Sequence, residues 1–435
     1  MGDNINMSHR PITPAFTREF PSAALSAPVD CQPIDWPSPQ LDAAVAELAL
    51  LFALQRELVR TQAAWMAGVP YWDAKQAIAR HILEDAHHTE ALLKRLHELK
   101  VRSAEHRQIA GVEELVRDLA SAPHGDAWLR GLYTRIKPWL AERFAGYLAA
   151  HEPLMDQPSR DIIGPTVTRL RAQIAWFETY GPQHSAWETA HSDTWCEFVA
   201  ARLPAAPHDP GQLATVATAP ALPPDHPAFD GIRRIRRDRT FAATERGTFP
   251  REGATFAEKR FLVFYNHTQE MQFAESLGAI LYETAEMPWA FHYDLARHLA
   301  DEVRHATMGQ TRLEQLGVAL TELPMLTEHY DFRANLDPLE RFCLMTLVME
   351  ATAFERKRAN VDLFEQHGDP LSALYETYDI KDEMLHTHLG HTWVPVMLRV
   401  YHDARSVTEL TEHCRAQIAQ VINSYPSNAA NMVKR

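Results

Sequence analysis

Apolar residues recur every three or four positions along most of the chain, which is the spacing of one face of an α-helix. In the first half this pattern covers residues 41–67, 71–99, 126–154 and 160–180. In the second half it covers residues 258–285, 289–317, 337–366 and 371–402, and a further helix is expected near 406–423. The pattern predicts an all-α fold in which each half forms a four-helix bundle.

Two segments interrupt the helical pattern because they are rich in Pro and have no apolar period. Residues 1–40 are rich in Pro and Ser, and residues 203–255 are rich in Pro, Ala and short charged pieces. We interpret them as an N-terminal arm and an interdomain linker. The expected domains are therefore a first bundle at residues 41–202 and a second bundle at residues 256–435.

The two halves resemble each other when one is laid along the other. The helix that begins near Trp72 then falls on the helix that begins near Trp289, and both contain the string ARH, at residues 79–81 and 296–298. The third helix of each half contains the string ERF, at residues 142–144 and 340–342. These matches indicate a tandem duplication of one bundle.

Composition narrows the class of protein. At 435 residues the chain exceeds the usual size of one hydrophobic core, which agrees with two domains. The net charge of -14 argues against a nucleic-acid partner, because phosphate binding depends on clustered Lys and Arg.

The N-terminus lacks the basic-then-apolar order of a signal peptide, and no apolar run approaches the ~20 residues that span a membrane. With four scattered cysteines, the expected location is the cytoplasm.

Two Glu-x-x-His pairs carry the candidate chemistry. Glu302 and His305 lie in the string DEVRH, and Glu383 and His386 lie in DEMLH, each within a predicted helix of the second half. Residues three apart differ by about 60° around a helix, so both members of a pair can point inward. Because the pairs lie on alternate helices of one bundle, they favour a metal site over a solvated surface.

A pair of metal ions in a helical bundle also needs single carboxylates from the other two helices. Glu350 is the candidate on the third helix. On the first helix the candidates are Glu270 and Glu275, and the alignment of the two halves tips the choice slightly to Glu275. Only one of the two can face the site readily, because five residues turn a helix by about 140°.

An aspartate precedes the glutamate of each pair. Asp301 and Asp382 lie about 100° around the helix from the glutamate that follows each of them, so each could reach an imidazole N–H on a neighbouring helix and fix its tautomer. The alternative is that both are surface aspartates. The whole set also has an alternative interpretation as a buried ion-paired network without metal, although burying several carboxylates without cations is costly.

The order carboxylate, Glu-x-x-His, carboxylate, Glu-x-x-His resembles the ferritin-like di-iron carboxylate superfamily. The string DEVRH is similar to the form found in bacterial multicomponent monooxygenase hydroxylases. The runs EMQFAESLGAILYETAEMPW, ARHLADEVRHATMGQTRLEQLG and IKDEMLHTHLGHTWV resemble a bacterial ferritin-like family of unassigned function. The resemblance covers residues 258–402, and it reaches the first half only through the repeat.

This resemblance implies a role for each candidate residue. It makes Glu302 and Glu383 bridging carboxylates, His305 and His386 terminal imidazoles, and Glu350 a terminal carboxylate. Glu275, or its rival Glu270, completes the set. The implied cofactor is two irons, with manganese or a mixed pair left open because the ligand types overlap. The first half has no histidine three residues after Glu178 on its fourth helix, so we expect it to be a metal-free scaffold.

The resemblance also implies a function. The expected activity is that of a non-haem di-iron oxidase or oxygenase, which uses dioxygen to oxidise a small organic substrate by hydroxylation, N-oxygenation, desaturation or oxidative cleavage. Loops around residues 318–337 are expected to admit substrate. An electron-donating reductase and a second copy of the chain are the partners considered. The alternatives are a ferroxidase or rubrerythrin-like protein that handles iron or peroxide, and a non-enzymatic helical partner protein with a structural metal.

Overall fold

The computed structural model describes residues 41–106, 109, 111–183, 189–203, 229, 231–232, 235–238, 241–244 and 254–424. These residues are helical except for connections and one short parallel pairing between β1 (Ala242–Thr244) and β2 (Pro324–Leu326). The all-α prediction is therefore confirmed. The predicted arm and most of the predicted linker lie outside the described residues.

The helices of the first half follow the predicted order, with two additions and one interruption. They are α2 (Leu41–Trp65), α3 (Trp72–Glu98), α4 (Val112–Ala120), α5 (Gly125–Gly131), α6 (Lys137–Ala150), α7 (Gln157–Tyr180) and α8 (Thr189–Arg202). A π-helical turn, η3 (Leu132–Ile136), separates α5 from α6 within the predicted helix 126–154. Pro138 lies at the start of α6, and because it has no backbone N–H it removes one helical hydrogen bond at this point.

The second half contains a similar interruption. Its helices are α9 (Phe256–Thr268), α10 (Met271–Glu283), α11 (Trp289–Gln315), α12 (Glu328–Arg333), α13 (Pro338–Cys343), α14 (Ala351–Gln366), α15 (Pro370–Val400) and α16 (Val407–Ser424). A π-helical segment, η7 (Leu344–Glu350), joins α13 to α14. The predicted single helix 258–285 is wrong, because the chain breaks at Gln269 and Glu270 between α9 and α10. The expected loop at 318–337 contains β2 and α12.

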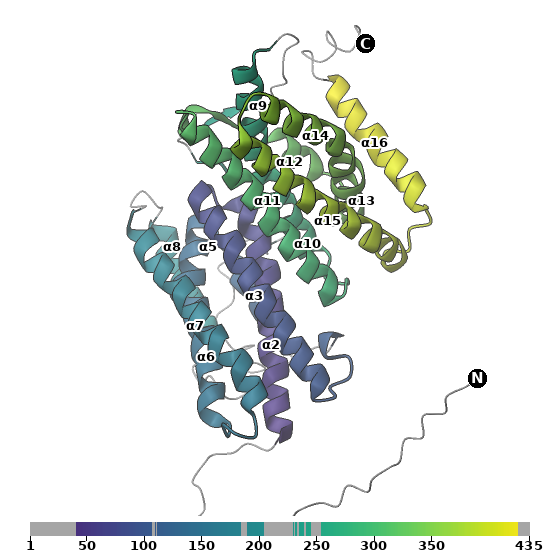
Figure 1. Cartoon of the computed structure of the whole chain (residues 1–435). Coiled ribbons are helices and arrows are strands. Elements are labelled where there is room, and N and C mark those ends of the chain that lie inside the picture. Colours follow the sequence, from purple (N-terminus) through teal and green to yellow (C-terminus); the bar gives the residue numbers. More distant parts are fainter. Residues whose placement is uncertain are drawn as a thin grey trace, which may run out of the picture. The chain divides into compact units, whose positions relative to one another are not determined.

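Helices of the two halves pack on each other. Figure 1 shows the order of the elements, and α2 contacts α10 while α3 contacts α11. The approach of α2 to α10 is close at Gly278, where an added Cβ would lie 2.2 Å from the carbonyl oxygen of Ala63. Phe52 of α2 meets Trp289 of α11 edge to face. One hydrophobic core therefore extends through both halves. The division into two tandem bundles stays a prediction.

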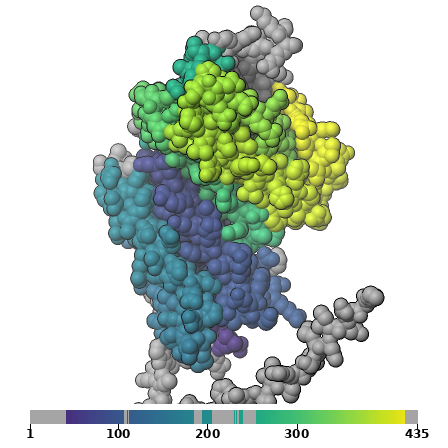
Figure 2. Space-filling view, viewed as in Figure 1, coloured from purple at the N-terminus to yellow at the C-terminus, as the bar shows by residue number. Residues whose placement is uncertain are grey.

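The first half of helix α15, residues 370–386, buries acidic residues and exposes apolar ones. Glu376, Asp379, Glu383 and His386 are buried. Leu371, Leu374, Tyr378, Met384 and Leu385 are exposed. Figure 2 shows part of the surface of α15 in yellow-green. Buried acidic residues on an otherwise apolar helix indicate a polar centre inside the protein. In the described part of the chain, no helix combines the length and apolar character needed to cross a membrane.

Candidate metal centre

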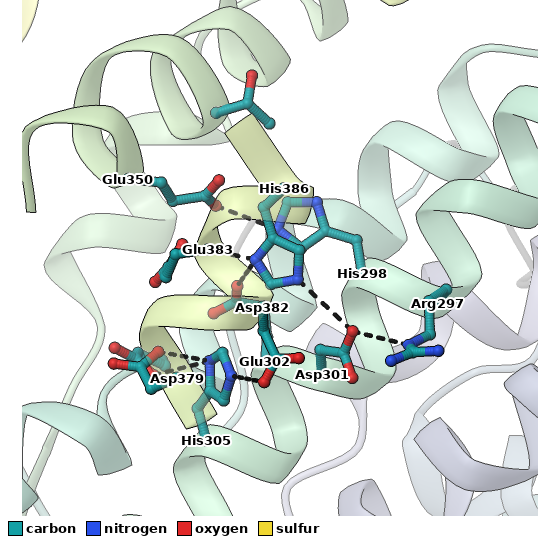
Figure 3. A network of polar contacts seen from close by, with 12 residues as sticks. Arg297, His298, Asp301, Glu302, His305, Glu350, Asp379, Asp382, Glu383 and His386 are labelled. Carbon is teal, nitrogen blue, oxygen red and sulfur yellow. Dashed lines mark hydrogen bonds and ion pairs between the residues drawn. The ribbon is translucent and has the colours of Figure 1, made fainter. Parts of the chain in front are cut away.

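Three helical segments of the second half direct carboxylates and imidazoles toward one another (Figure 3). Helix α11 supplies Glu302 and His305, α15 supplies Glu383 and His386, and Glu350 is the last residue of η7. All five are buried, and the structure brings them together. As expected for residues three apart on a helix, both members of each Glu-x-x-His pair face inward.

The cluster has two overlapping parts, which we name subsite A and subsite B. Subsite A consists of His298, Glu302, Glu350 and His386, whose candidate ligand atoms all lie within 4.8 Å of one another. Subsite B consists of Glu270, His305, Asp379 and Glu383, which form overlapping groups under the same criterion. Glu302 also groups with Glu270 and His305. It is therefore the carboxylate that lies between the two subsites.

Individual distances describe each subsite. In subsite A, Nε2 of His298 lies 3.1 Å from Oε1 of Glu350 and 3.2 Å from Oε1 of Glu302. Nδ1 of His386 lies 3.2 Å from the same Glu302 oxygen. In subsite B, Nδ1 of His305 lies 3.3 Å from Oε2 of Glu270 and 3.3 Å from Oδ1 of Asp379. A cation between these atoms would replace contacts that are now made between the side chains themselves.

The structure favours Glu270 over Glu275 as the carboxylate of the first helix. Glu270 lies at the junction of α9 and α10 and contacts His305. Glu275 is buried elsewhere, where it pairs with Lys75 of α3 and accepts hydrogen bonds of 2.6 and 3.0 Å from Arg237. The slight preference for Glu275 is therefore corrected. Two cations already neutralise its carboxylate, whereas Glu270 lies among the other candidate ligands.

Asp301 and Asp382 each lie beside an imidazole of the neighbouring helix. Oδ2 of Asp382 accepts a hydrogen bond of 3.1 Å from Nε2 of His305. Oδ2 of Asp301 lies 3.6 Å from Nε2 of His386. In both histidines the Nδ1 atom faces the glutamates, so the aspartates lie on the opposite side of each ring. This is the arrangement by which a carboxylate fixes an imidazole tautomer.

Sequence reasoning missed several members of the cluster. His298, Asp379, Lys357 and His267 were not among the predicted site residues. Helical spacing carried a signal for the first three: His298 lies four residues before Glu302, and Asp379 lies seven before His386. Lys357 lies seven after Glu350. Residues four or seven apart share a helix face, so these side chains follow the predicted ligands inward.

Burial sets the electrostatics of the cluster. Burial raises the pKa of Glu350 to about 7 and that of Asp379 to about 6, because a buried carboxylate loses its hydration. Burial alone would lower the pKa of His305 and His386, but nearby carboxylates raise the pKa of both well above the ordinary value. The imidazoles therefore hold protons that balance the carboxylates. A metal ion would have to displace those protons.

The residues present fit a pair of divalent cations. The five carboxylates of the cluster, those of Glu270, Glu302, Glu350, Asp379 and Glu383, have a formal charge of -5 when ionised, most of which two divalent cations would balance. Several buried donor and acceptor atoms in the cluster also have no hydrogen-bond partner: Glu270 Oε2, Glu302 Oε1, Glu350 Oε2, Glu383 Oε2, His305 Nδ1 and His386 Nδ1. Buried polar atoms that lack a hydrogen bond, even where they lie within ion-pair distance of one another, indicate a ligand site. Oxygen and imidazole donors suit iron, manganese and zinc.

The equivalent position in the first half contains a different network. Asp85 of α3 accepts hydrogen bonds from Gln62 of α2 at 2.9 Å, from Lys137 of α6 at 2.8 Å, and from Gln173 of α7 at 3.1 Å. A shift of 213 residues lays Lys137 on Glu350 and Gln173 on His386. The ERF strings at 142–144 and 340–342 align Glu152 with Glu350, but Glu152 lies beyond the end of α6 and accepts a hydrogen bond from the backbone N–H of Met155. The ammonium of Lys137 and the amide of Gln173 thus occupy positions that candidate ligands occupy in the second half.

Comparison with known proteins adds one finding. Residues 231–434 match a protein family described as a protein of unknown function, DUF455. The matched region contains every residue of subsites A and B. No curated protein matches the chain, and no solved structure matches it.

Proposed function

We propose that this protein is a ferritin-like non-haem oxidase or oxygenase that uses two metal ions, expected to be iron, to oxidise a small organic substrate with dioxygen. The observation that carries the proposal is the pair of subsites joined by Glu302, with nitrogen and oxygen donors within 4.8 Å of one another. Manganese or a mixed pair remains open because the same donors bind both metals. An electron-donating reductase and a second copy of the chain are the proposed protein partners.

Several features of the chain support catalysis by such a centre. When bound, a ferrous pair supplies electrons for the reduction of dioxygen. Asp382 and Asp301 hold the rings of His305 and His386 with Nδ1 directed at the glutamates. The carboxylates of Glu302, Glu350 and Glu383 are at most 3% exposed, so the interior limits water access. Restricted water protects a reactive oxidant from side reactions.

The first test is metal content per chain, measured by elemental analysis after anaerobic reconstitution with ferrous iron. The wild type should hold about two ions, as four-helix carboxylate centres do. Glu383→Ala and His386→Ala should lose at least one ion, because each removes a ligand atom from the interior. Glu365→Ala, at an exposed position of α14, is the matched control and should keep the wild-type content.

The second test is dioxygen consumption by the reconstituted protein in the presence of a panel of small organic compounds. Uptake that depends on one compound class, and that Glu383→Ala abolishes, supports an oxygenase. Iron oxidation that proceeds without any organic compound and accumulates many ions per chain would instead favour iron handling. Absence of bound metal after reconstitution would favour the alternative that the cluster is a buried ion-paired network without metal.

A further inference from the structure

Lys357 lies inside subsite B. It is on α14, two helical turns after Glu350, and it is buried. Its Nζ atom lies 2.6 Å from Oδ2 of Asp379 and 2.6 Å from Oε1 of Glu383. It also lies 3.7 Å from Oε1 of Glu270. The ammonium therefore contacts all three carboxylates of subsite B.

In the described part of the chain, no lysine or arginine forms an ion pair with the carboxylates of subsite A, although the buried guanidinium of Arg333 interacts electrostatically with Glu302 and Glu350. Among the described residues, the ion-pair partners of Glu302 and Glu350 are imidazoles: His298 contacts both, and His386 contacts Glu302. An imidazole changes from counterion to ligand when it gives up a proton, without leaving its place. An ammonium has no comparable second role here, because its three donors leave no lone pair for a metal while it is charged.

We propose that the ammonium of Lys357 and a metal ion compete for the carboxylates of subsite B, so that the centre loads in order, subsite A first and subsite B second. This inference rests on the proposed metal centre. A cation entering subsite B must displace Lys357 from Asp379, Glu383 and Glu270. Two like charges cannot share these oxygen atoms at close range in a buried site. The flexible stem of lysine allows the displacement without movement of α14.

The arrangement also explains how the protein folds before it receives metal. Asp379 and Glu383 are buried and Glu270 is partly buried, and carboxylates in such places without enough cations would oppose folding, since each unpaired buried charge is costly. Lys357 neutralises part of this charge in the metal-free protein. The same contact weakens subsite B as a metal site. The lysine thus stabilises the empty centre and makes the two subsites unequal.

The experiment is a calorimetric titration of the full-length, metal-free protein with Mn²⁺ under anaerobic conditions. The wild type should bind one ion tightly and a second ion more weakly. In Lys357→Met the second ion should bind about tenfold more tightly or better, because its competitor is gone. The first ion should bind as in the wild type. Lys259→Met, at an exposed lysine of α9, is the matched control and should leave both steps unchanged.

Two further variants keep the test decisive. Lys357→Gln retains a hydrogen-bond donor without the charge, and it should tighten the second step even if the apolar methionine variant folds poorly. Lys357→Arg retains the charge, so its second step should stay weak. Thermal melting in the presence of a chelator provides an independent readout. The metal-free Lys357→Gln protein should melt at a lower temperature than the wild type, and Mn²⁺ should restore more stability to it.

The outcomes separate this inference from the proposed function. Two equal binding steps in the wild type, or a second step that Lys357→Gln and Lys357→Met leave unchanged, would overturn the competition. A single ion in the wild type and two in Lys357→Gln would support it in its strongest form. Ordered loading without substrate-dependent dioxygen uptake would support the competition while the oxygenase proposal fails. No bound metal in any variant would overturn both.

Discussion

At the scale of single residues, Arg304 connects the two aspartates that lie behind His386 of subsite A and His305 of subsite B. Its Nη2 atom donates hydrogen bonds of 2.8 Å to Oδ1 of Asp301 and 2.6 Å to Oδ2 of Asp382. These are the aspartates that lie behind His386 and His305. One guanidinium therefore holds the orientation of both imidazoles. Because Arg304 lies two residues after Glu302 on α11, its backbone belongs to the same rigid element as that glutamate.

The choice between Glu270 and Glu275 gives a prediction at the residue scale. Glu270→Ala should reduce the metal content, because it removes a carboxylate of subsite B. Glu275→Ala should keep the metal content but lower the free energy of unfolding by about 3 to 5 kcal/mol, since it leaves Lys75 and Arg237 buried without their partner. Elemental analysis and urea unfolding of the two variants measure these effects. Loss of metal in Glu275→Ala alone would reverse the assignment.

The sequence could not settle this choice for a physical reason. The rotation of about 140° between Glu270 and Glu275 holds only if both lie on one continuous helix. The break between α9 and α10 changes the rotational phase at Glu270. The neutralising partner of Glu275 was equally hidden, because Lys75 is 200 residues away in the chain. By contrast, Glu302, His305, Glu383 and His386 could be predicted because each pair lies within one unbroken helix. Local spacing predicts side-chain direction only while the helix continues.

At the scale of elements, the π-helical segment η7 positions Glu350. A π-helical turn contains one residue more than an α-helical turn, and it changes the direction of every side chain that follows it relative to those before it. Glu350 ends η7, and Lys357 follows two turns later on α14. The extra residue therefore sets which face of α14 meets α15. The π-helical segment could not be predicted from periodicity, because the apolar spacing of residues 337–366 agrees with a single α-helix.

Insertion of one residue in η7 tests this role. The π-helical turn already accommodates one extra residue, so a second one, an alanine placed after Val348, should rotate Glu350 relative to α13 by about 100°. The far-ultraviolet circular dichroism should stay helical, while the metal content should fall because subsite A loses a carboxylate. Val348→Ala, which keeps the length of η7, should retain the metal. An insertion variant that binds metal as the wild type does would contradict this account.

At the scale of the whole molecule, the two halves differ in how they neutralise a buried carboxylate. The second half combines imidazoles, Lys357 and, in our proposal, metal. In the first half, Lys137 forms a buried ion pair with Asp85, and two glutamines complete the network. Such a network needs no ion, which supports the expectation of a metal-free scaffold. The helices of this scaffold pack against α10 and α11, so its stability is linked to that of the candidate centre.

Substitution of Lys137 tests the scaffold role. Lys137→Met should lower the free energy of unfolding by about 3 to 5 kcal/mol, because Asp85 is left as an uncompensated buried charge. The metal content of the folded protein should not change. Chemical unfolding and elemental analysis on the same preparation measure both quantities. A loss of metal in folded Lys137→Met would show that the first half contributes directly to the centre.

The packing of the first half against the second could not be predicted from the sequence. Helix positions could be predicted because each helix has a continuous apolar stripe, and most predicted ranges agree with the structure to within a few residues. The packing of α2 on α10 could not, because it depends on Gly278 allowing a close approach to Ala63 across the core. The described pieces of the segment treated as a linker also contact both halves. Arg236 donates to the carbonyl of Ala67, and Arg237 pairs with Glu275.

The two π-helical segments have a consequence for the history of the chain. The shift of 213 residues that lays Lys137 on Glu350 also lays η3 inside η7. Under the predicted tandem duplication, an extra residue at the same place in both copies would come from a single insertion in the ancestral bundle. Lys137 and Gln173 would then be later differences between the copies. The ancestor would have been a lone bundle that already contained the insertion.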